Sequence, residues 1–324
     1  MKSIYEVKIN SMINNYEELK KEFKWDGDSV KHLVALTYAI KDKTLDTDEI
    51  KDVKAYLKKE TGTFSPFRGT MMFALCGLIS AASETPKVYL QNMIDNLKIL
   101  KSVGFKSSTY LPTALYALST VYEGNDVEGF AEKAYEIYKE MKKNHPFLTS
   151  GDDYALAILL ANTNQNPDLL ETYYKALNAE GFYKSNGLQM LSHIMTFNKS
   201  DVTVSVDRCK RVLDELKKNK LRVSYDYYPA VGLISLIDQN HDEMIQDLID
   251  VSKYLSQQKK YKWLGKGMHI MMASAIITSE YIKGNDGDVV STAVTVSIQA
   301  IIAAQQAAMI AAITASTAAT SAAT

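Results

Sequence analysis

Side chains that could do chemistry gather at one recurring position in this sequence, just before segments rich in apolar residues. They are Arg68, Tyr110, Asp152, Asp153, Tyr154, Asn186, Tyr225, Asp226 and Lys266. Carboxylates beside cations could exchange protons with a ligand or bind a charged one, and tyrosines could stack on it or hydrogen bond to it. We therefore take these residues as a candidate binding site along one rim of the fold.

Helix capping is the competing interpretation of the same residues. Ser, Thr, Asp and Asn are preferred at helix N-caps, and acidic residues in a first turn interact favourably with the helix dipole. Ser150 and Asp153 even have the spacing of a capping box. Capping accounts for the acids and hydroxyls but not for Arg68 and Lys266, because cations are disfavoured at helix N-termini.

Motifs for metals, cofactors and nucleophiles are missing from the sequence. The histidines are scattered, and no HExxH, CxxC, GxGxxG, P-loop or GxSxG pattern occurs. His193 and His269 fall in apolar segments, where a hydrogen-bonded core histidine is the common case. We expect no metal and no cofactor, and the sequence favours a protein that is not an enzyme without excluding one.

The elements that would position these side chains repeat along the chain. An amphipathic segment, a turn and a segment rich in apolar and small residues recur, and the turns are marked by Trp25, Phe64, Phe105, Phe147, Phe182, Leu221 and Tyr261. Successive turn residues lie 35 to 42 residues apart, which is the spacing of a two-helix repeat. The sequence thus predicts an all-α fold of about seven helical hairpins.

The two helices of each predicted hairpin differ in character. The first is amphipathic, as in residues 201–220, whereas the second is apolar on nearly every side and carries small residues such as Gly77 and Gly232. A helix that is apolar all round is buried all round, so the second helices should form an inner layer and the first helices an outer one. We favour an open superhelix or solenoid, since such repeat arrays are usually open, and a closed α/α toroid is the alternative.

The overall composition bounds the class of protein. The chain has 324 residues, 46% apolar residues and a net charge of −1. This composition suits a large core and gives no general attraction to nucleic acid or to an anionic membrane. Two cysteines do not make a disulfide framework, and residues 1–16 lack the apolar stretch of a secretory signal. We therefore expect a cytoplasmic protein with a single repeat domain over residues 1–288.

The last part of the chain, residues 289–324, carries no charge and is rich in alanine, serine and threonine. Alanine is the best helix former, and alanines between Ala300 and Ala322 recur at spacings of three or four residues. We expect a C-terminal helix packed against the last hairpins, with a frayed end. Self-association through the alanine seam is a second option. A membrane span is disfavoured because the segment has little hydrophobic driving force.

Three short runs resemble a known bacterial family. They are residues 105–112 (FKSSTYLP), 148–155 (LTSGDDYA) and 186–194 (NGLQMLSHI). Over essentially its whole length the chain is similar to an uncharacterised Firmicutes family known as domain of unknown function 4003. The resemblance implies a cytosolic bacterial protein of near this length, and it implies no activity, cofactor or catalytic residue.

The predicted architecture indicates function only by class. Arrays of helical hairpins have curved surfaces that commonly bind partners, so we expect a non-enzymatic scaffold that binds a protein or peptide on its concave face. The alternative is an enzyme or a small-ligand-binding protein that uses the rim formed by the starts of the inner helices. No motif identifies the partner, the substrate or the oligomeric state.

Overall fold

The computed structural model describes residues 1–69, 71–162, 168–237, 240–284, 309–310 and 313. Between residues 3 and 284 it contains fourteen α-helices and three short 3₁₀ segments. The α-helices are α1 (Ser3–Glu22), α2 (Asp28–Ile40), α3 (Thr47–Glu60), α4 (Met72–Ala82), α5 (Pro86–Val103), α6 (Leu111–Val121), α7 (Val127–Asn144), α8 (Tyr154–Ala161), α9 (Asp168–Ala179), α10 (Asn186–Met195), α11 (Val202–Lys218), α12 (Tyr228–Ser235), α13 (His241–Gln257) and α14 (Gly265–Gly284). The 3₁₀ segments are η1 (Pro66–Arg68), η2 (Gly151–Asp153) and η3 (Tyr225–Tyr227).

The helices follow one another as seven hairpins, each an odd-numbered helix and the even-numbered helix after it. The two helices of a hairpin pack together in α3–α4, α5–α6, α9–α10, α11–α12 and α13–α14. The predicted all-α hairpin repeat is therefore confirmed.

The described chain divides into two compact units, which we treat separately. Unit 1 comprises residues 1–6, 140–149 and 163–324, and unit 2 comprises residues 7–139 and 150–162. A single domain over residues 1–288 stays a prediction, as does the choice between an open superhelix and a closed toroid.

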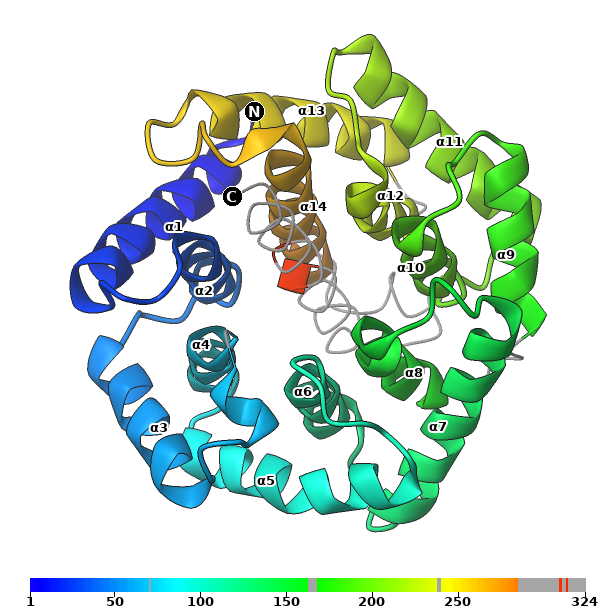
Figure 1. Ribbon diagram of the computed structural model, residues 1–324. Coiled ribbons are helices and arrows are strands. Elements are labelled where there is room, and N and C mark those ends of the chain that lie inside the picture. The colour runs from blue at the N-terminus through cyan, green and yellow to red at the C-terminus, as the bar shows by residue number, and fades with distance from the viewer. Residues whose placement is uncertain (70, 163–167, 238–239, 285–308, 311–312, 314–324) are drawn as a thin grey trace, which may run out of the picture. The chain divides into compact units, whose positions relative to one another are not determined.

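Each unit has the two layers that the sequence predicts. In unit 2 the inner helices α2, α4, α6 and α8 pack side by side in that order, and the outer helices α3 and α5 pack against each other. In unit 1 the inner helices α10, α12 and α14 pack in sequence, and the outer helices α9, α11 and α13 do the same. Figure 1 shows α10 and α12 strongly foreshortened and α14 obliquely, with the outer helices of this unit beside them.

Burial separates the two kinds of helix. Every residue of α8 and of α12 is buried, whereas α3 buries only Ile50, Val53 and Leu57, which share one helix face. Small residues allow the inner helices to approach closely. A Cβ atom on Gly77 of α4 would lie 2.6 Å from the Val34 side chain of α2, so this position needs glycine.

The turn between the outer and the inner helix follows one geometry in three hairpins. Phe105, Phe182 and Leu221 each donate a backbone N–H to the carbonyl five residues earlier, and each side chain is buried. The residue before each of them has a positive φ. These preceding residues are Gly104, Gly181 and Lys220. This is the Schellman ending of a helix, in which glycine is preferred because it adopts a left-handed conformation without strain.

The other predicted turn markers divide into two kinds. Tyr261 is buried, but Trp25, Phe64 and Phe147 are fully exposed. In the first two hairpins the buried aromatic residues are instead Phe23 and Phe67, which lie close by in sequence. The sequence period identified the turns correctly but not which aromatic residue of each turn enters the core.

The uncharged C-terminal segment is described at three positions. Met309, Ile310 and Ile313 are helical and buried. The rest of the predicted helix over residues 289–324, and with it the proposed seam for self-association, lies outside the described residues. Among the helices that the structure describes, none is long and apolar enough to cross a membrane.

Candidate docking surface

The rim is the set of connections that lead from each outer helix to the inner helix of the same hairpin. Its seven connections are residues 23–27, 61–71, 104–110, 145–153, 180–185, 219–227 and 258–264. Because the helices alternate in direction, these connections lie at one end of the hairpins within each unit. The predicted site residues all lie in these connections or in the first turn of the inner helix that follows.

Neighbouring connections of unit 2 touch one another along the rim. A Cβ atom on Gly69 would lie 3.5 Å from the Thr109 side chain, and one on Gly151 would lie 3.0 Å from the Ser108 hydroxyl and 3.5 Å from the Tyr110 ring. These contacts join three neighbouring connections of unit 2, and they bring Tyr110 beside the segment that carries Asp152 and Asp153.

Arg68 caps the preceding outer helix. Its guanidinium donates from Nε to the Thr61 hydroxyl at 3.1 Å, and from Nη2 to the carbonyl oxygens of Lys58 and of Thr61, the latter at 2.5 Å. These acceptors lie at the C-terminus of α3, where a cation is favoured by the helix dipole. Helix capping therefore explains the presence of Arg68, contrary to the sequence analysis. The side chain caps the C-terminus of α3 and not the N-terminus of α4.

The two neighbouring aspartates of unit 2 also make local hydrogen bonds. Asp153 is buried and accepts the backbone N–H of Ser150 at 2.9 Å, completing the capping box that the sequence suggests. Asp152 accepts the Ser150 hydroxyl. The Tyr154 hydroxyl accepts the backbone N–H of Lys106 at 3.2 Å, which ties this inner helix to the preceding connection.

Neighbouring parts of the unit 1 rim also touch one another. A Cβ atom on Gly187 would lie 1.7 Å from the Tyr225 carbonyl oxygen, so α10 and η3 are in direct backbone contact. The ring centroids of Tyr183 and Tyr225 are 5.9 Å apart. Lys266 donates to the carbonyl oxygen of Lys220 at 3.1 Å, just beyond the end of α11. Like Arg68, Lys266 therefore binds a carbonyl oxygen near the C-terminal end of an outer helix.

Two further predicted site residues of unit 1 are exposed. Asn186 is the first residue of α10, directly before Gly187, and therefore lies beside η3. Asp226 lies in η3, and partial desolvation raises the pKa of its carboxyl group. The structure brings Asn186, Tyr225 and Asp226 to one place on the rim. Whether the predicted residues bind a ligand stays a prediction.

Exposed aromatic side chains are the feature of the rim that the sequence analysis missed. All six exposed aromatic residues in the described part of the chain belong to the rim, and they are Trp25, Phe64, Phe147, Tyr183, Tyr225 and Trp263. Phe147 is 98% exposed and Trp263 is 82% exposed. Single exposed apolar residues are normal, but the restriction of the aromatic ones to the rim connections within each unit is typical of an interaction surface. The sequence does contain a signal for this surface. Five of the seven connections have a second aromatic residue in addition to a buried aromatic residue.

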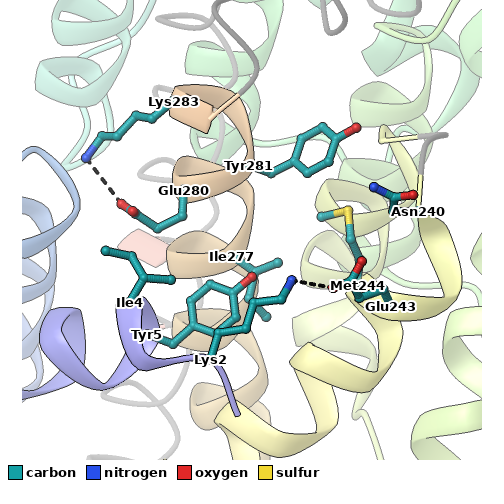
Figure 2. Close-up of a pocket in the computed structure, with 10 residues that line it drawn as sticks. All are labelled: Lys2, Ile4, Tyr5, Asn240, Glu243, Met244, Ile277, Glu280, Tyr281 and Lys283. Carbon is teal, nitrogen blue, oxygen red and sulfur yellow. Dashed lines mark hydrogen bonds and ion pairs between the residues drawn. The ribbon is translucent and has the colours of Figure 1, made fainter.

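An open pocket lies in unit 1, away from the rim. It has a volume of about 420 Å³ and is lined by the start of α1, the start of α13 and the end of α14. Figure 2 shows its charged side chains in pairs: Lys2 lies 2.8 Å from Glu243, and Lys283 lies 3.3 Å from Glu280. Because these charges neutralise each other, the pocket has no excess of either sign to attract an ion.

Asp247 anchors the start of the chain beside this pocket. Its carboxylate is buried and accepts the Tyr5 hydroxyl at 2.9 Å and the Lys2 ammonium at 2.7 Å. Burial, and then the neighbouring carboxylate, raise the pKa of Tyr5, so this hydroxyl stays protonated and donates. The arrangement fixes the first turn of α1 and therefore has a structural purpose.

The histidines of unit 1 form no constellation for catalysis. His145 Nε2 lies 2.8 Å from Glu171, at the end of α7 and on α9. His193 is fully buried in α10, where desolvation lowers the pKa of the imidazole to about 3, so it stays neutral. In the described residues no group of three or more His, Cys, Asp or Glu side chains is arranged to hold a metal ion.

Comparison with known proteins confirms the family resemblance of the sequence. The chain is 28% identical over 308 residues to the protein of Bacillus subtilis (strain 168) described as "Uncharacterized protein YeaA", and the match covers 92% of each chain. No solved structure is significantly similar to it. A family model matches residues 15–307, which is most of the sequence. The chain therefore belongs to the bacterial family described as "Protein of unknown function (DUF4003)".

Proposed function

We propose that this protein is a non-enzymatic helical-repeat scaffold that binds a protein or peptide partner through its rim. The observation that carries the proposal is the set of six exposed aromatic side chains, all on the rim. Aromatic residues dominate the energetics of protein interfaces because each buries a large apolar area with few rotatable bonds. Exposing them to water is unfavourable unless a partner covers them.

The local bonding of the predicted site residues supports a scaffold over an enzyme. Arg68 and Lys266 bind carbonyl oxygens near the ends of outer helices, and Asp153 binds a backbone N–H. A catalytic acid, base or cation has to point at a bound substrate. These groups point instead at their own backbone, so their hydrogen bonds build the rim.

The rim replaces the concave face as the proposed binding surface. The sequence favoured the concave face by analogy with other helical repeats. Exposed aromatic residues favour the rim instead, because the inner helices of both units bury almost all of their large apolar side chains. We further propose that the scaffold works in the cytoplasm, and the free, buried thiols of Cys76 and Cys209 support a reducing compartment.

Site-specific photo-crosslinking tests the proposal. A photoreactive phenylalanine analogue replaces Phe147 or Trp263 in the full-length chain, in the native bacterial host. The matched control carries the analogue at Val204, which is exposed on the outer helix α11. We expect both rim positions to give the same stoichiometric protein adduct and Val204 to give none. No adduct from the rim, or the same adduct from Val204, would reject the proposal.

A further inference from the structure

The rim of unit 1 concentrates positive charge. Its connections between residues 180 and 264 carry six exposed cations, which are Lys184, Lys220, Arg222, Lys259, Lys260 and Lys262. Glu180 and Asp226 are the acidic residues of the same connections. Because the whole chain has a net charge of −1, this excess is a local property of the unit 1 rim.

Helix stabilisation explains only part of this charge. Lysines in the last turn of an outer helix interact favourably with the helix dipole, as Lys217 and Lys218 do in α11. The dipole effect falls off within that turn. Lys259, Lys260 and Lys262 lie beyond the end of α13 and are exposed to solvent. The positive charge of these three exposed side chains adds to that of Lys184, Lys220 and Arg222 on the same rim.

The same connections also carry exposed aromatic side chains. Lys262 Nζ lies 4.7 Å from the centroid of the Trp263 ring. The rings of Tyr183 and Tyr225 are paired, and Lys184 follows Tyr183 in the chain. Aromatic anchors surrounded by charged residues are the usual anatomy of a protein interface.

Several parts of this rim are held in place before any partner binds. Lys142 donates to the carbonyl oxygens of Pro146 and Thr149 at 2.5 and 2.6 Å, beside the exposed Phe147. Lys266 is tied to the carbonyl oxygen of Lys220. The Tyr228 hydroxyl accepts the backbone N–H of Tyr183 at 3.2 Å, which fixes the connection that presents this ring. A surface ordered in advance loses less entropy on binding.

We infer that the rim of unit 1 binds an acidic peptide segment of the partner, one in which acidic residues alternate with apolar ones. The inference rests on the proposed function, and it names the chemistry of the partner at that surface. Acidic side chains of the segment lie against Lys184, Arg222 and the cluster Lys259–Lys260–Lys262. Its apolar side chains cover the rings of Phe147, Tyr183 and Trp263.

The mixed charge of the rim favours a peptide over a lipid surface or a nucleic acid. Both of the latter present uninterrupted negative charge, which Glu180 and Asp226 repel. A peptide can place uncharged residues opposite these two carboxylates. Connections that are held by hydrogen bonds also suit a partner with a defined sequence, whereas a fluid lipid surface needs no such order.

Peptide selection against the intact protein tests the inference. A display library of random short peptides is panned on the full-length chain, and selected peptides are measured by fluorescence anisotropy. We expect enrichment in Asp and Glu together with apolar residues. Binding should weaken by about tenfold or more in K259E/K260E/K262E and with rising salt. The matched control K133E/K139E/K199E changes the net charge equally at exposed positions outside the unit 1 rim, and should bind as the wild type does.

The possible results separate this inference from the proposed function. Selected peptides without acidic enrichment, whose binding still requires Phe147 and Trp263, would overturn the inference and leave the scaffold standing. Vesicles of phosphatidylglycerol and polyuridylic acid serve as the competing probes. Binding of either one that is lost in K259E/K260E/K262E, with no acidic peptide selected, would also overturn it. If photo-crosslinking from the rim gives no protein adduct, the scaffold itself fails.

Discussion

The guanidinium of Arg68 lies 3.1 Å from the hydroxyl of Thr61, at the point where helix α3 ends. Through this contact, and through the carbonyl oxygens of Lys58 and Thr61, one side chain of the rim closes the preceding outer helix. We expect R68A to lower the free energy of unfolding by about 1 to 2 kcal/mol, because it leaves these carbonyls without their charged donor. Urea denaturation of the full-length chain measures this loss.

The lysine variant shows whether geometry or charge matters at this position. R68K keeps the positive charge but lacks the several planar N–H donors of a guanidinium. It should therefore recover only part of the stability that R68A loses. A fully stable R68A would contradict the capping role of Arg68.

Gly187 and Tyr225 are in contact through the backbone of η3. A Cβ atom at position 187 would meet the Tyr225 carbonyl oxygen at 1.7 Å, so G187A must displace η3 or the start of α10. We expect a loss of about 1 to 3 kcal/mol in the free energy of unfolding. G62A is the control, since a Cβ atom there has no neighbour within 4 Å, and it should change stability by less than about 0.5 kcal/mol.

Acid should destabilise the fold through His193. Its pKa falls from 6.5 to about 3 on folding because the imidazole is desolvated. Between these values the unfolded chain binds more protons than the folded one. The contribution of neutral His193 to the free energy of unfolding is therefore fully present above pH 6.5, and it is lost as the pH decreases. The contribution is on the order of 1 kcal/mol per pH unit between these two pKa values.

The variant H193N removes this titration. Its unfolding free energy, measured by denaturant titration from neutral to acidic pH, should depend less steeply on pH than that of the wild type. Parallel curves for the two proteins would show that His193 is not the group responsible.

Asp247 holds the first turn of α1 through Tyr5 and Lys2. The variant D247N weakens both contacts, so amide hydrogen exchange in residues 1–6 should become faster and stability should fall by about 1 to 3 kcal/mol. D250N is a matched control, because Asp250 pairs with the N-terminal ammonium at 3.5 Å and is partly exposed. Equal effects of the two variants would contradict the anchoring role of Asp247.

The sequence predicted the hairpins and the rim because both rest on repeated patterns of burial. Helices such as α8 and α12 are apolar on every side, and the Schellman turns place glycine or lysine before a buried residue. These signals are local, so a single sequence contains them.

The individual roles of the rim residues were harder to predict, because they depend on contacts between repeats. Lys266 binds a carbonyl oxygen 46 residues earlier in the chain, and no local pattern connects the two positions. Phe23 and Trp25 are two residues apart in an irregular connection, where no helical period indicates which side chain is buried. The sequence shows a second aromatic residue in five of the seven connections, but only the structure shows which of the aromatic side chains are exposed.

The central claim is that the exposed rings of the rim bind a partner and do not stabilise the fold. The most direct test measures the dissociation constant of the crosslinked partner for the wild type and for F147A/W263A, a variant that should unfold within about 0.5 kcal/mol of the wild type. We predict binding at least about tenfold weaker, since two interface anchors are lost. An unchanged dissociation constant would contradict the claim.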